Sequence, residues 1–165
     1  MMLAPLLLTL VQDRVILGGE NFLIRIENPK GLVSEKIKPN KEGVIARFRN
    51  LAGAVYTVYS EPRPKLEKVE AAVDRRLLKL KKDRPGAAVR SKGTRENLFR
   101  EVANLFEVVA PDKEPVQLAI YTSPKVIFTV EAILPKAEDE ESFIQFEQLY
   151  LSYAFITDRV RQKGI

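Results

Sequence analysis

Short apolar segments alternate with turn residues through residues 1–61, and this pattern limits the possible folds more than any other feature of the chain. In one such segment, Phe22, Ile24 and Ile26 would lie on one face of an extended chain, whereas Leu23 and Arg25 would lie on the other. Turns rich in Gly, Pro and Asn separate the segments at intervals of about ten residues. The spacing predicts an antiparallel β unit, either a small sandwich or a half-barrel.

We expect strands at residues 14–17, 22–26, 32–37, 44–49 and 54–59, and a buried strand at residues 1–11. A stiff break follows at Glu61-Pro62-Arg63-Pro64, because proline restricts both its own backbone and that of the residue before it. We therefore predict a β unit at residues 1–61 and an α/β unit with a C-terminal helix at residues 65–165. The two units either fold separately or share one domain.

Helical periodicity appears after this break. An apolar stripe with helical spacing predicts a helix over residues 65–83, and its members are Leu66, Val69, Val73, Leu77 and Leu80. Thr94 is a candidate N-cap for a second helix over residues 95–108, whose apolar face contains Leu98, Val102, Leu105 and Phe106. Residues 87–93 between these helices are expected to form a basic loop.

The remaining elements complete an α+β prediction. Residues 116–121 and 125–134 form two apolar segments around a Thr-Ser-Pro-Lys turn, which predicts a β-hairpin. The acidic run at residues 138–141 favours a helix start, and basic residues near 159–163 favour its end, so we expect one long helix from this run to about residue 162. The predicted fold is α+β, with an N-terminal antiparallel β unit, two helices, a β-hairpin and a long C-terminal helix.

The composition excludes several kinds of catalytic site. The chain contains no Cys and no His, so it has no thiol nucleophile, no Ser-His-Asp triad and no His/Cys zinc site. Asp and Glu leave chemistry with a carboxylate pair and Mg²⁺ open, but the densest acidic run, at residues 138–141, lacks the spacing of a calcium loop. We expect a protein that is not an enzyme, with no catalytic residue, cofactor or metal.

Two further expectations come from composition. The absence of Cys, His and Trp, together with abundant Lys, Arg and Glu, is typical of a thermophile. No run approaches the roughly 20 apolar residues that a membrane span needs, so we place the protein in the cytoplasm.

A one-sided basic face is the first candidate binding surface. On the predicted helix over residues 65–83, six basic residues share one arc, and Arg90 and Lys92 extend the positive charge into the following loop. The six are Lys65, Lys68, Arg75, Arg76, Lys79 and Lys82. Such a face is typical of a surface that binds phosphates, and the loop could hold an anion at the start of the next helix. The alternative is an ordinary solvated helix face.

A second apolar stripe on the C-terminal helix is the other candidate surface. Ile144, Leu151 and Phe155 form this stripe, and polar positions separate it from the main apolar face. A helix packed on one side of a small domain needs only one apolar face. The second stripe is therefore either buried within the same chain or covered by a second copy or a partner protein.

These features predict a non-enzymatic protein that takes part in protein–protein interactions or is an assembly subunit of a larger complex or filament. Its contacts would be made by the C-terminal helix and by the edges of the β unit. The alternative function is nucleic-acid binding through the basic helix face and the basic loop.

Overall fold

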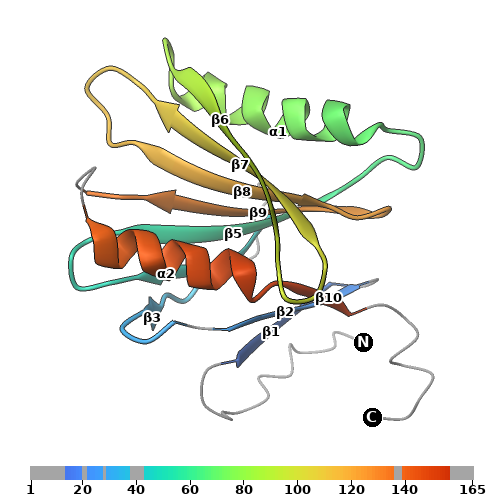
Figure 1. Cartoon of the computed structure of the whole chain (residues 1–165), viewed down its shortest axis with the longest axis horizontal. Coiled ribbons are helices and arrows are strands. Elements are labelled where there is room, and N and C mark those ends of the chain that lie inside the picture. Colours follow the sequence, from blue (N-terminus) through green and yellow to red (C-terminus); the bar gives the residue numbers. More distant parts are fainter. Residues whose placement is uncertain (1–13, 20–21, 28, 38–42, 136–138, 157–165) are drawn as a thin grey trace.

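The computed structural model describes residues 14–19, 22–27, 29–37, 43–135 and 139–156. Its central element is a seven-stranded antiparallel sheet with the order β3-β4-β5-β9-β8-β7-β6 (Figure 1). The strands of this sheet are β3 (Val33–Ser34), β4 (Val44–Arg49), β5 (Val55–Pro62), β6 (Ala88–Glu96), β7 (Val102–Val109), β8 (Val116–Thr122) and β9 (Val126–Ile133). Strands from both sides of the proline-rich break share it, since β5 pairs with β9 over eight residues.

The two helices of the described residues lie on opposite faces of this sheet (Figure 1). Helix α1 (Val69–Asp83) packs Val73 and Leu80 against one face, where they meet Ile120 and Ile127. Helix α2 (Glu140–Leu151) packs its apolar side against the other face. The sheet therefore separates two apolar cores, one under each helix.

This sandwich explains why the central strands are apolar along their whole length. In β8 and β9 nearly every residue is buried, because odd and even positions each face a helix-covered core. Burying both faces of a strand replaces the alternating pattern with a nearly continuous apolar run. The predicted hairpin over residues 116–134 is confirmed as β8 and β9.

A smaller antiparallel sheet lies beside α2. It has the order β1-β2-β10 and consists of β1 (Arg14–Gly19), β2 (Phe22–Glu27) and β10 (Ala154–Ile156). Ile26 of β2 is fully buried in the same core as α2. The described residues thus form a mixed α+β fold, as predicted, with most of the N-terminal strands in place. The strand expected at residues 1–11 lies outside the described residues.

The predicted second helix over residues 95–108 is wrong. These residues form the end of β6, a tight turn and β7, so the described residues contain one helix fewer than expected. The predicted basic loop at residues 87–93 is also wrong, because residues 88–93 belong to β6. Asn97 holds the turn: its side-chain oxygen accepts hydrogen bonds from the amides of Phe99 and Glu101, at 2.9 and 3.0 Å. Pairing of β7 with strands on both sides outweighs the helical spacing of its apolar residues.

The C-terminal helix is shorter than predicted. It begins in the expected acidic run, where the Asp139 side chain accepts a hydrogen bond from the amide of Ser142. It ends at Leu151, and the chain then enters β10, which pairs with β2. The helix was predicted to continue to residue 162, and this prediction is wrong for residues 152–156, which are not helical. Residues 157–162 lie outside the described residues.

Two glycines with positive φ provide a matched test of the backbone. Gly43 has a φ of 78°, and a Cβ there would lie 2.5 Å from the carbonyl oxygen of Ser60. Gly53 has a φ of 89°, but a Cβ there would have no atom within 4 Å. We expect Gly53→Ala to lower the free energy of unfolding by about 1–2 kcal/mol, from backbone strain alone. Gly43→Ala should cost about 1–3 kcal/mol more, because the methyl group would push β5 aside. Urea denaturation of both variants measures the difference, and equal losses would contradict this account.

Candidate functional site

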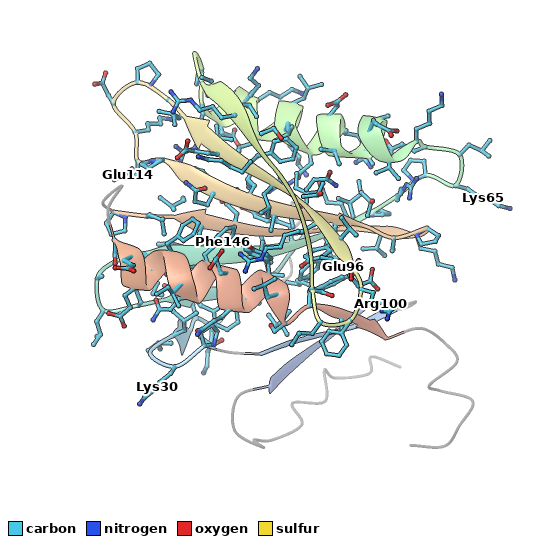
Figure 2. The ribbon with its side chains drawn as sticks, viewed as in Figure 1. Lys30, Lys65, Glu96, Arg100, Glu114 and Phe146 are labelled. Carbon is cyan, nitrogen blue, oxygen red and sulfur yellow. The ribbon has the colours of Figure 1, made fainter. Side chains whose placement is uncertain are left out.

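An open groove of about 270 Å³ lies between α2 and the end of the sheet formed by β6, β7 and β8. We call it the α2 groove. Its apolar lining includes Leu105, Pro115, Leu134, Phe143 and Phe146. Its polar lining consists of Lys92, Glu107, Gln117, Glu147 and Tyr150. Phe146 lies between the helix and the sheet (Figure 2) and is buried. Phe143, which also lines the groove, is 41% exposed.

A buried hydrogen-bond network fixes the position of α2 beside this groove. The hydroxyl of Tyr56 donates to the carbonyl oxygen of Ser142 at 2.9 Å. The side chain of Asn50 donates to the side-chain oxygen of Gln145 at 2.8 Å, and Gln145 donates to the carbonyl of Lys30. Burial raises the pKa of Tyr56 to about 12, so its hydroxyl remains a donor at neutral pH. The groove therefore has a helix wall held by polar contacts as well as by packing.

Each carboxylate of the groove has cationic or polar partners. Glu107 lies 3.6 Å from Arg90 and 3.7 Å from Lys92, and it accepts a hydrogen bond from Gln117 at 3.2 Å. Two cations thus share one carboxylate. Because these pairs are partly exposed, their strength is limited by water and salt.

A second pair closes the other end of the groove. Arg95 of β6 forms an ion pair with Glu147 of α2, and Tyr150 lies 3.4 Å from both side chains. Burial raises the pKa of Tyr150, and the negative charge of the neighbouring Glu147 raises it further. The hydroxyl of Tyr150 therefore stays protonated. This pair connects the edge strand of the sheet to the helix.

The predicted basic face is divided by the fold. Lys65 and Lys68 are exposed but precede the first residue of α1, and Lys82 is exposed near its end (Figure 2 labels Lys65). Arg75 pairs with Glu67, and Lys79 pairs with Glu61. These ion pairs use part of the positive charge that the sequence pattern assigns to the surface.

Arg76 lies beneath α1 and not on its solvent face. Its side chain is 4% exposed, it lies 3.6 Å from Glu131, and its guanidinium stacks on the Tyr59 ring at 4.1 Å. Arg90 and Lys92 were predicted in a loop before a helix, but both belong to strand β6. Lys92 lines the α2 groove, and Arg90 lies beside Glu107 of its lining. The anion site predicted at the start of a following helix therefore has no helix to form it.

The predicted apolar interface is also divided. Ile144 is 44% exposed on α2, next to Phe143. Leu151 is partly buried and packs against the core of the same chain. Phe155 lies in β10, paired with Ile24, and its side chain lies outside the described part of the structure. Only Ile144 of the three is therefore seen to be exposed on α2.

Sequence reasoning missed the sheet side of the groove. Leu105 and Glu107 were expected on a helix, but they belong to β7. The signal that could have identified this strand is its β-branched and aromatic content, since Val102, Phe106, Val108 and Val109 all favour strands.

The described residues contain neither a membrane-spanning helix nor an acidic metal-binding cluster. Within them, no helix has the length and apolar character needed to cross a membrane. The same part of the chain contains no cluster of three or more Asp or Glu side chains able to hold a metal ion.

These features define an α+β protein with a seven-stranded antiparallel sheet, a helix on each face and a groove beside the second helix. A solved structure with a similar fold is the solution structure of cyanobacterial PsbP (CyanoP) from Synechocystis sp. PCC 6803. The two match with a TM-score of 0.57 and 15% sequence identity, over 88% of this chain and 94% of that chain. This likeness concerns the fold. No family model and no curated protein matches the sequence significantly.

Proposed function

We propose that this protein is a non-enzymatic interaction module that binds a partner protein through the α2 groove. The observation that carries the proposal is an open, partly apolar groove that includes the exposed Phe143, with the exposed Ile144 as the next residue of α2. Exposed aromatic and aliphatic side chains at the mouth of a pocket are typical of protein-binding sites.

The opening of the groove supports a protein partner. The groove holds about 270 Å³ and opens beside Phe143, which is 41% exposed, so a side chain of a partner protein can enter it from solvent. An opening of this size suits a large apolar side chain of a partner, which would contact Leu105 and Phe146 inside the groove. The rim would then supply polar contacts through Lys92, whose side chain is 52% exposed.

Selection from a displayed library of random twelve-residue peptides, using the immobilised full chain, tests this proposal. We expect the selected peptides to shift the NMR amide signals of residues around the groove. Phe143→Ser should weaken their binding at least tenfold, because it removes the apolar side chain at the opening. The matched control is Leu78→Ser, which removes an exposed apolar side chain from α1 on the other side of the sheet.

Two results would contradict the proposal. One is a library that yields no peptide binding above background. The other is a set of selected peptides that bind the Phe143→Ser variant as tightly as the original chain. Circular dichroism of both variants should remain unchanged, since neither replaced side chain is buried.

A further inference from the structure

Strand β6 is a long and exposed edge of the seven-stranded sheet. It has nine residues, all but Val89 exposed, and within the described residues it pairs only with β7. The opposite edge, β3, has only two residues. An edge strand presents unpaired backbone N–H and C=O groups, which can pair with another extended chain.

Three of the four charged side chains of this edge are basic, and the fourth is Glu96 at its end. The side chains of Arg90, Lys92 and Arg95 are 66%, 52% and 47% exposed. Arg90 pairs in register with Glu107, and Arg95 with Ala103, so both belong to the face of the sheet that α2 covers. The side chains of β6 itself therefore carry three positive charges and one negative charge, and the neighbouring carboxylates Glu107 and Glu147 pair with the basic ones.

A bulge interrupts β6 in the middle. The register shifts between Ser91 and Gly93, where Gly93 has a φ of 86° and its amide donates to the Ser91 hydroxyl at 3.2 Å. A bulge and an edge lysine are devices that discourage pairing between edges of identical molecules. Four residues on each side of Lys92, at 88–91 and 93–96, have partners on β7.

Charge decides between the possible occupants of this edge. A second copy pairing through β6 would bring its own basic side chains beside Arg90, Lys92 and Arg95, which is unfavourable. An acidic segment would instead place opposite charges beside them. Because Lys92 also lines the α2 groove, the same segment could place an apolar side chain at the groove opening.

We propose that the β6 edge binds an extended acidic segment of a partner protein, which adds to the sheet as an eighth strand. This inference rests on the proposed function and specifies the partner chemistry. The backbone of the segment would supply affinity through hydrogen bonds to β6, and its alternate side chains would supply specificity through Arg90, Lys92 and Arg95.

The test uses two synthetic nine-residue peptides that alternate Val with either Glu or Lys, titrated into the isotope-labelled full chain. We expect the Glu peptide to bind at least tenfold more tightly than the Lys peptide. It should also slow hydrogen exchange of β6 amides, which a purely electrostatic contact would not do. N-methylation of alternate backbone amides in the Glu peptide should remove binding without changing its charge.

A matched pair of charge variants checks the location. The triple variant Arg90→Gln/Lys92→Gln/Arg95→Gln should weaken binding of the Glu peptide at least tenfold. The control Lys65→Gln/Lys68→Gln/Lys82→Gln removes the same charge from exposed positions in and before α1 and should change binding less than twofold. Equal losses in the two variants would overturn the inference, as would unprotected β6 amides.

Failure of this inference can be distinguished from failure of the proposed function. If library peptides depend on Phe143 but the Glu peptide leaves β6 amides unprotected, the groove remains a binding site and the edge inference is wrong. If the chain forms a dimer in light scattering with β6 amides protected, the edge belongs to a second copy, and the inference is again wrong.

Discussion

Replacement of Arg76 by alanine is expected to lower the free energy of unfolding by about 3–5 kcal/mol. Arg76 and Glu131 are both almost fully buried, and the nearest nitrogen and oxygen of the pair are 3.6 Å apart. Removal of the guanidinium would leave the Glu131 carboxylate buried, with the hydroxyl of Tyr59 at 3.3 Å as a neutral partner. Denaturation with urea measures the loss.

The neighbouring Arg75 provides a matched control for this prediction. Its side chain is 41% exposed and donates two hydrogen bonds to the Glu67 carboxylate, at 2.9 and 3.0 Å. Because this pair is exposed to water, Arg75→Ala should cost less than about 1 kcal/mol. The double variant Arg76→Met/Glu131→Leu should recover most of the loss, since it removes both buried charges. A loss in Arg76→Ala no larger than that in Arg75→Ala would contradict the prediction.

The pH dependence of Arg76→Ala provides an independent check. Burial raises the pKa of Glu131 above its usual value, and the nearby Arg76 opposes this shift. A carboxyl group whose pKa is higher in the folded state favours folding at low pH and loses this contribution as pH rises through the folded pKa. Without Arg76 the folded pKa should rise further. The deficit of the variant relative to the original chain should therefore shrink as pH falls from about 7 to about 5. A deficit independent of pH would contradict this explanation.

The second large effect is expected at Tyr153, which lies two residues after the end of α2. Its buried ring stacks on both Tyr121 and Phe128, with centroid distances of 4.4 and 4.3 Å, and those two rings are 6.2 Å apart. Tyr153→Ala should lower the free energy of unfolding by about 3–5 kcal/mol, because a cavity would replace the ring that contacts both of the others. Chemical denaturation and the near-ultraviolet circular dichroism of the tyrosines measure the change.

Two substitutions control the Tyr153 experiment. Tyr153→Phe keeps the ring and should cost less than about 1.5 kcal/mol, as expected for a change that preserves volume. Leu51→Ala removes a fully exposed apolar side chain and should be close to neutral. If Tyr153→Ala costs no more than Leu51→Ala, the ring stack does not support the core under α2.

Local sequence signals were sufficient where one periodicity dominated. The alternation in residues 44–49 predicts β4 with its observed bounds, and the stripe containing Val73 and Leu80 predicts the helix that becomes α1. The acidic run before α2 predicts its start, because carboxylates near a helix N-terminus accept hydrogen bonds from free amides.

The same signals failed at β7 for a physical reason. Leu98, Val102, Leu105 and Phe106 have helical spacing, but β7 contributes apolar residues to the core on each face of the sheet and is paired on both edges. A strand in that environment can be apolar at any position, so its sequence carries no clear period of two. Both the groove wall and the β6 edge depend on this strand, and neither could be located without it.

The amino-acid sequence alone was enough for the α+β class, most of the N-terminal strands, the exclusion of Cys- and His-based chemistry and the existence of basic and apolar surfaces. Tertiary contacts decided which of those surfaces face solvent. Arg76 is buried because its partner Glu131 lies on β9, 55 positions away in the chain, and Leu151 is partly buried because the helix ends there and the chain pairs with β2. Helical periodicity defines the faces of a helix, but only long-range packing determines which neighbour each face meets.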